Sequence, residues 1–285
     1  MRMWRSIGVM TVATLQISCA TISQINFLST ADEIQIGRQA ARDVERSLPM
    51  YKDPEVVAYV QELGRVLAEQ AKRKDVAYTF KVVDRSDVNA FALPGGWLYV
   101  NAGLIAAADT ESELAGVMAH EIGHVVGRHG ARQISARYGL SLLLEIVAGG
   151  PNGDSITRQI AGEFAGLGAG LTLLKYGRDM EREADALAVD ETFAAGIDPA
   201  GMVGFFKKLM KLHESEPEGL DVLFTTHPPT NERIESIAAD IAKLPPRTGL
   251  RKDSAKFQRI KAKVAAYLKA KPRKERAPPA RSRVR

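Results

Sequence analysis

Apolar residues recur at helical spacing along most of this chain. The segment 54–72 repeats them every three or four positions from Val56 to Leu67, which predicts a helix with one buried face. Asp53 precedes it and supplies a side-chain acceptor for the first turn. A similar pattern predicts another helix at 30–48.

Three short segments read as strands instead. Residues 78–83 are rich in β-branched and aromatic side chains, and the apolar runs 89–93 and 97–101 flank Pro-Gly-Gly at 94–96. A glycine-containing turn between two apolar runs is typical of a hairpin. We therefore expect a small β-sheet built around this hairpin.

The helix with the clearest signals follows the hairpin. Thr110 and Glu113 form the T-x-x-E pattern of a capping box, and an apolar face runs from Leu114 to Val125. The strands thus lie just before a strongly predicted helix.

The rest of the chain reads as helical. A Gly- and Leu-rich stretch at 139–176 predicts a helical hairpin, either a lid or a membrane-contacting surface. Further helices are predicted at 178–194, 199–213, 230–244 and 254–269. Helices dominate and the strands cluster, so the fold class is α+β, mainly α-helical. We expect one domain at 30–245, a C-terminal helix within 246–270 and a disordered tail at 271–285.

Composition places the chain among globular proteins. Its 285 residues are 45% hydrophobic and 26% charged. The net charge of +5 comes from the tail, because 271–285 carries seven Lys/Arg and one Glu. The body is about neutral, so nothing in it favours a nucleic-acid partner. The tail is either a solubilising end or a contact for anionic lipid.

The N-terminus has the features of an export signal. Two arginines precede an apolar run at 7–17, which is too short to span a bilayer, and Cys19 follows. This resembles a bacterial lipoprotein signal, although Gln16 stands where that pattern prefers leucine. We expect a signal peptide at 1–19, export to the periplasm and anchoring to the outer membrane through lipidated Cys19.

Candidate chemistry begins with an H-E-x-x-H motif on the strongly predicted helix. Residues four apart share a helix face, so His120 and His124 can reach one metal ion. Glu121 lies about 100° round the helix from His120, within reach of water beside that ion. The residues on either side of the motif are uncharged. The alternative, in which the two histidines and Glu121 are exposed on the helix by chance, is therefore less favourable.

A catalytic zinc ion usually has three protein ligands and one open position. Glu181 and Asp185 lie on one face of a later helix, so one can bind the metal while the other orients an imidazole. Spacing alone allows either assignment. The other downstream candidates are Asp179, Glu183, Asp190, Glu191, His213 and His227.

At this point the chain resembles the family of zinc metallopeptidases that includes HtpX and the type-1 CAAX prenyl proteases, which are gluzincins. Within it the exported bacterial branch of the BepA and LoiP type is most similar. H-E-x-x-H followed by E-x-x-x-D carries the resemblance. It implies a zincin-type domain, one zinc ion per chain, Glu181 as third ligand, Asp185 behind the ligands and Arg178 as a nearby site arginine.

The segment before the zinc helix also resembles this family. It begins Asn89-Ala90-Phe91-Ala92 and ends at Gly96. The resemblance implies that a strand edge here pairs with the extended backbone of the substrate, which is strand addition.

His227 has three possible roles. His227 is the first residue of an H-P-P-T-N segment that also resembles the family. In some exported relatives this histidine fills the open metal position and keeps the enzyme latent. It can instead stabilise the oxyanion at the scissile carbonyl, or merely cap a turn. His129 and His213 read as structural.

These features predict a zinc-dependent endopeptidase that acts on unfolded or misassembled proteins of the cell envelope. Glu121 is the expected base, with His227 beside it. One alternative is a latent protease that works mainly as a chaperone-like assembly factor. A weaker one is a structural or storage zinc protein.

Overall fold

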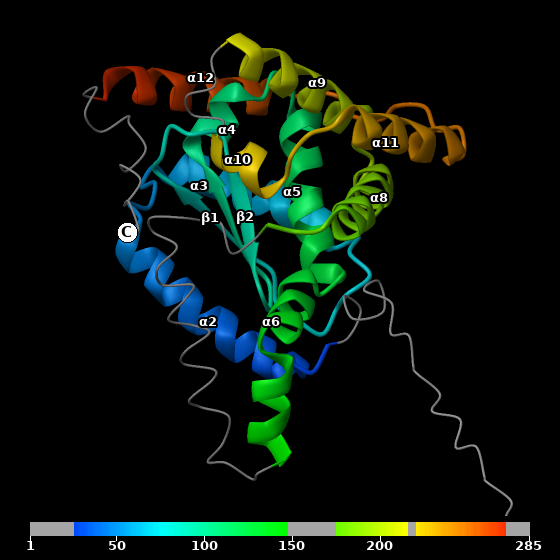
Figure 1. Cartoon of the computed structure of the whole chain (residues 1–285). Helices are drawn as coiled ribbons and strands as arrows, with labels where there is room; N and C mark the ends of the chain where they lie inside the picture. The colour runs from blue at the N-terminus through cyan, green and yellow to red at the C-terminus, as the bar shows by residue number, and fades with distance from the viewer. Residues whose placement is uncertain (1–25, 148–174, 216–220, 272–285) are drawn as a thin grey trace, which may run out of the picture.

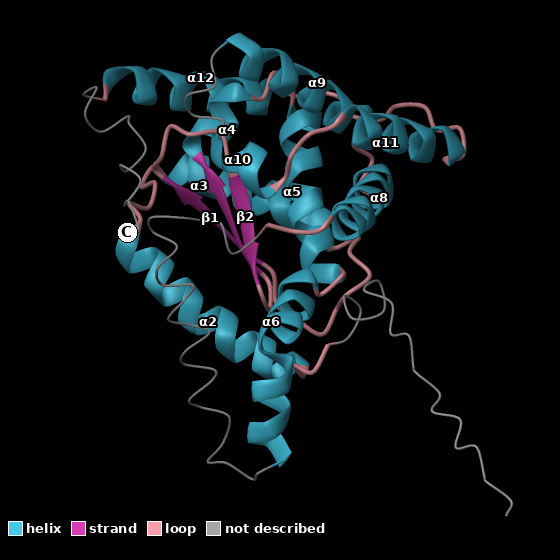
Figure 2. Cartoon of the chain, viewed as in Figure 1, coloured by secondary structure: helices cyan, strands magenta, loops and turns pink. Residues whose placement is uncertain are grey.

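The computed structural model describes residues 26–147, 175–215 and 221–271, and Figure 2 shows a mainly helical body around one small sheet. The helices are α2 (Thr30–Ser47), α3 (Pro54–Ala68), α4 (Ala102–Ala107), α5 (Glu111–Val126), α6 (His129–Val147), α8 (Arg178–Ala194), α9 (Ala200–Ser215), α10 (Asp221–Thr226), α11 (Asn231–Lys243) and α12 (Ala255–Ala270). The predicted α+β, mainly helical class is confirmed.

The sheet has three strands in the order β1-β3-β2. β2 (Ala90–Leu93) and β3 (Trp97–Asn101) form the predicted antiparallel hairpin, and β1 (Thr79–Val83) pairs with β3 in parallel. Gly95 and Gly96 in the turn have φ values of 78° and 105°, which only glycine adopts without strain. β2 therefore forms one edge of this sheet.

Apolar side chains cover both faces of the sheet. On one face Ala90 and Ala92 of β2 join the main core with α3, α5, α9 and α12, and on the other Phe91 and Leu93 pack with α2. Figure 1 shows α2 (blue) along one side of the sheet and α5 on the other side, in the middle of the molecule. Alternation along β2 thus points successive side chains into two separate cores.

α5 is the central helix, and close packing fixes its neighbours. Every side chain of α5 except Glu113 and Val126 is buried. A Cβ on Gly123 would lie 2.8 Å from Ala184 O of α8, so the missing side chain lets the two helices approach closely. This approach brings the H-E-x-x-H residues against the first turns of α8.

The capping pattern of α5 differs in one half from the expectation. The Thr110 side chain accepts a hydrogen bond from Glu113 N, as expected. The Glu113 carboxylate, however, accepts from Asp109 N at 2.7 Å rather than from the cap residue. In both the expected and the observed arrangement, the Glu113 carboxylate accepts a hydrogen bond from one further backbone N–H near the helix start.

Four helical details differ from the sequence prediction. α6 begins at His129, ten residues before the predicted hairpin at 139. The short helices α4 and α10 are not predicted, because six residues carry too little periodicity. α3 ends at Ala68 instead of 72, where the Lys74 amine donates to the carbonyls of Ala68 and Glu69 at 3.3 and 2.7 Å. A lysine that follows a helix can stabilise its last carbonyls in this way.

α12 packs on the body of the protein. Phe257, Ile260 and Val264 are buried in the main core, so this helix is not a loose appendage. The domain limits at 30–245 and 246–270 stay predictions. Three predicted segments lie outside the described residues: the signal peptide at 1–19, residues 148–174 of the 139–176 hairpin, and the tail after 271. Among the described helices, none combines the length and the apolar character needed to cross a membrane.

Glu191 of α8 is a buried carboxyl group with an unusual proton affinity. Its side chain is 3% exposed, and within the described residues neither carboxylate oxygen has a hydrogen-bond partner. Burial and the neighbouring charge of Asp190 raise the pKa of Glu191 to about 8. The folded protein therefore binds a proton here that the unfolded chain has released above about pH 4.3.

We predict that Glu191 makes stability fall as pH rises. Between its unfolded and folded pKa values the folded state holds more protons, so the free energy of unfolding decreases with pH. Relative to Glu191→Gln, wild type should lose about 3 kcal/mol between pH 5 and pH 8. Urea unfolding at several pH values measures this. The exposed Glu235→Gln should show a pH profile parallel to wild type, and a parallel profile for Glu191→Gln would contradict the prediction.

Candidate active site

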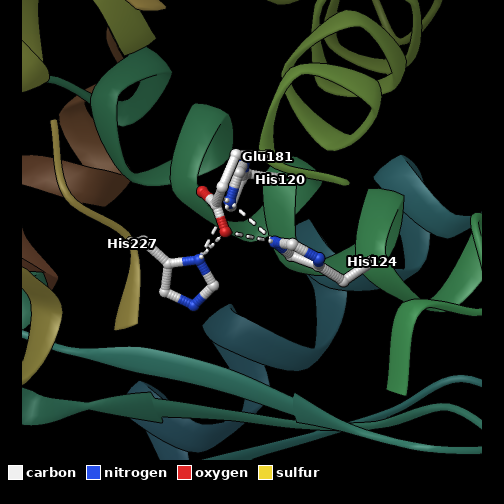
Figure 3. Close-up of side chains that lie close together, drawn as sticks. All are labelled: His120, His124, Glu181 and His227. Atoms are coloured by element: carbon white, nitrogen blue, oxygen red, sulfur yellow. Dashed lines mark hydrogen bonds and ion pairs between the residues drawn. The ribbon is translucent and has the colours of Figure 1, made fainter. Parts of the chain in front are cut away.

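The H-E-x-x-H helix and α8 bring the predicted ligands together. In Figure 3 the side chains of His120, His124, Glu181 and His227 converge on one point. His124 Nε2 lies 3.0 Å from His120 Nε2 and 3.5 Å from Glu181 Oε1. His227, which follows α10, places its Nδ1 2.9 Å from Glu181 Oε1.

These four side chains form a donor set that suits a metal ion. One nitrogen or oxygen atom from each lies within 4.8 Å of the others, and all four side chains are buried. Two imidazoles and one carboxylate are the ligands of many catalytic zinc sites, and a fourth protein ligand closes the coordination sphere. The donor chemistry therefore fits a zinc ion held by His120, His124 and Glu181, with His227 in reach of the remaining position.

The electrostatics of the cluster also favour a cation. Burial lowers the pKa of His120, but the carboxylates of Asp185 and Glu181 outweigh it and raise the pKa to about 9. The pKa of Glu181 is held far below its usual range by His227 and His120, although burial opposes this. The pKa of His124 is lowered, mainly by burial. A positive charge stabilises the buried carboxylates of Glu181 and Asp185, and a bound metal ion would supply one.

Asp185 lies behind His120 and is itself held by an arginine. Its Oδ1 is 2.9 Å from His120 Nδ1, which leaves His120 Nε2 facing the other donors. Arg233 of α11 binds Asp185 with two nitrogens, at 2.8 and 2.7 Å, and places Nη1 2.8 Å from Glu181 Oε2. Asp185 thus occupies the position that the resemblance implies for it.

The arginine beside the site carboxylates in the structure differs from the predicted one. Arg178, the first residue of α8, has an exposed side chain. Arg233 takes that place, with a side chain that is 7% exposed.

Two residues outside the predicted site contact His124: Tyr176, and His129, which is predicted to be structural. His129 Nδ1 lies 2.8 Å from His124 Nδ1, and the Tyr176 ring stacks on His124 at 4.0 Å between centroids. Burial lowers the pKa of His129 to about 4, although Glu183 opposes the shift. His129 is therefore a neutral imidazole at neutral pH.

Glu121 lies where a base would be needed. Its side chain is 2% exposed, it accepts a backbone hydrogen bond from Ala92, and its Oε1 is 3.6 Å from His227 Nε2. Burial raises the pKa of Glu121, against the opposing effect of His227 and His120. A raised carboxylate pKa suits a group that takes up and returns a proton near neutral pH.

The four predicted edge-strand residues divide into two pairs. Asn101 N donates to Asn89 O, so Asn89 and Phe91 direct their backbone groups toward β3 in the alternating antiparallel pattern. Phe91 also stacks on Tyr99 on the face that packs with α2. Ala90 and Ala92 therefore turn their N–H and C=O groups to the side of β2 away from β3, where the Ala92 N–H donates to Glu121.

Comparison with known proteins agrees with this geometry. Residues 54–241 match peptidase family M48. The chain is 31% identical over 216 residues to the beta-barrel assembly-enhancing protease of Escherichia coli strain K12, which covers 73% of this chain but 43% of that protein. Two further relatives from that strain are metalloprotease YcaL, at 29% identity (75% of this chain, 82% of the relative), and metalloprotease LoiP, at 27% (80% and 92%).

The chain therefore belongs to peptidase family M48, a family of metallopeptidases. The resemblance inferred from the motifs is confirmed. The chain spans less than half the length of the assembly-enhancing proteases it matches, and most of the length of LoiP and YcaL.

Proposed function

We propose that this protein is a zinc-dependent endopeptidase that hydrolyses peptide bonds in unfolded or misassembled proteins. The observation that supports this proposal most directly is the arrangement of His120, His124 and Glu181 around one point, with the buried carboxyl of Glu121 beside it. Membership of family M48 supports the same reaction.

Each residue has a defined task in this proposal. A bound zinc ion would polarise the scissile carbonyl and lower the pKa of water. Glu121 takes the proton from the attacking water and later gives it to the leaving amine. The backbone groups of Ala90 and Ala92 that face away from β3 hold the substrate as an added strand. For this pairing, the substrate must compete with Glu121 for the Ala92 N–H group.

The ligand set has a direct test in zinc content. Purified wild type should carry about one zinc per chain by elemental analysis, because one site with three protein ligands is expected. Glu181→Ala should lose the metal or bind it much more weakly, whereas the exposed Glu232→Ala should match wild type. A wild-type protein without metal, purified in the absence of chelators, would contradict the peptidase proposal.

A latent protease that works mainly as an assembly factor is the second candidate. The observation that favours it is His227, whose Nδ1 lies 2.9 Å from Glu181 and 3.3 Å from His120 Nε2. Zinc sites closed by four protein ligands are typically structural, whereas catalytic sites keep one position open. A histidine in this place would therefore hold the site in an inactive state.

We expect His227→Ala to increase proteolysis if His227 closes the site. Cleavage of a fluorescent casein, followed at equal zinc content for both proteins, measures this. A severalfold rise supports latency. A large loss instead assigns His227 to the oxyanion at the scissile carbonyl, since removing such a donor costs about 10²–10³ in rate. An unchanged rate leaves His227 a structural residue of a constitutive enzyme.

We also propose that the protein acts in the periplasm, anchored to the outer membrane through lipidated Cys19. The signal-like N-terminus supports export. One relative is named for enhancing β-barrel assembly, which supports a role in the quality control of envelope proteins. Fractionation of cells that make the protein tests this placement.

A further inference from the structure

The turn between α5 and α6 has an unusual backbone conformation. Arg128 has φ of 55°, the only positive φ at a non-glycine residue in the described part of the chain. Such a conformation is unfavourable for a residue with a side chain and persists only when its surroundings hold it. Here the Arg128 guanidinium pairs with buried Glu33 and donates to Leu28 O at 2.7 Å.

This turn places His129 directly against a metal-site histidine. On a continuous helix, residues five apart differ by about 140° in direction and do not meet. Because the chain turns at Gly127 and Arg128, His129 comes back under α5 and its Nδ1 lies 2.8 Å from His124 Nδ1. The His129 side chain is fully buried.

Gly127 leaves the space that the His129 ring occupies. A Cβ at this position would lie 2.3 Å from His129 Nε2 and 2.8 Å from its Cδ2 and Cε1 atoms. The glycine and the strained Arg128 therefore contribute to the same result, which is a fixed position for one imidazole.

The contacts continue from His129 to the surface. His129 Nε2 lies 3.1 Å from Glu183 Oε2, and that oxygen lies 2.8 Å from Arg132 Nη1. Because Glu183 accepts at Nε2, His129 carries its proton there and presents the lone pair of Nδ1 to His124. His124 then donates its Nδ1–H, which leaves Nε2 free as the metal-binding atom.

We propose that His129 is a positioning residue that fixes the tautomer and orientation of His124, with Glu183 and Arg132 holding His129 in turn. This proposal rests on the proposed metal site. It gives the two histidine ligands different supports: Asp185, paired with Arg233, behind His120, and a neutral imidazole behind His124. Partners of this kind typically change metal affinity by 10–100-fold.

The test compares variants that keep or remove the acceptor at His129. His129→Asn places a carbonyl oxygen near the position of Nδ1, whereas His129→Leu has no acceptor. Zinc affinity is measured by competition with a chromogenic chelator, and the visible spectrum of the cobalt-loaded protein reports ligand geometry. We expect His129→Leu to bind zinc about 10–100-fold more weakly with an altered cobalt spectrum, and His129→Asn to recover most of the loss. His213→Asn, at a histidine of α9 whose ring stacks on Phe224 and not on a ring of the site, is the matched control.

A second pair of variants avoids a change in the core. Glu183 is 45% exposed, so its substitution should leave the fold intact. Glu183→Leu should weaken zinc binding severalfold, whereas Glu183→Gln keeps an acceptor for His129 and should resemble wild type. If wild type binds zinc and both leucine variants bind it equally well, the positioning role is overturned. If wild type itself binds no zinc, the proposed function fails instead.

Discussion

Glu121→Gln should reduce kcat/KM for protein cleavage by about 10³-fold, within the 10²–10⁴ range typical of a lost general base. This corresponds to about 4 kcal/mol of transition-state stabilisation. Glutamine has the same shape and can still accept the hydrogen bond from Ala92, but it cannot take up a proton. Zinc content should stay at the wild-type level, because the three ligand side chains are untouched.

Glu113→Gln is the matched control for this experiment. It makes the same change about two turns earlier on α5, and the amide oxygen can still accept from Asp109 N. Both proteins are assayed with fluorescent casein beside wild type at equal zinc content. If Glu121→Gln keeps more than about a tenth of the activity, far above what loss of a general base allows, Glu121 is not the base.

Much of the site follows from the sequence because local patterns determine it. The helical period and the capping signals predict α5 from Thr110, and α8 has the predicted bounds at 178 and 194. H-E-x-x-H and E-x-x-x-D then place two pairs of side chains on two helix faces. The Pro-Gly-Gly turn likewise predicts the β2–β3 hairpin, since only glycine suits its two positive φ values.

The missing parts depend on contacts between distant segments. Arg233 comes 48 residues after Asp185, and no spacing rule joins them. The family resemblance implies Arg178 instead, whose side chain is exposed in the structure. His129 is missed for a different reason: helical periodicity continued through Gly127 turns it away from His124, and only the turn at Arg128 reverses this.

Arg233→Met should lower the free energy of unfolding by about 3–5 kcal/mol, the usual cost of removing one partner of a buried ion pair. Methionine replaces the length of the side chain but leaves the carboxylates of Asp185 and Glu181 without their cation. Asp185 is 2% exposed and binds Arg233 through both oxygens, so the substitution removes two of its hydrogen bonds and leaves His120 Nδ1, 2.9 Å away, as its partner. Urea unfolding of the metal-free protein, prepared with a chelator, measures this loss without a contribution from zinc binding.

Two further variants separate the buried charge from other causes. Arg182 also pairs with two carboxylates, Asp179 and Glu232, but its side chain is 44% exposed, so Arg182→Met should cost less than about 1 kcal/mol. Adding Asp185→Asn to Arg233→Met should recover part of the stability, because a neutral amide is easier to bury than an unpaired carboxylate. If Arg233→Met cost no more than Arg182→Met, the buried ion pair would not be what holds α11 against α8.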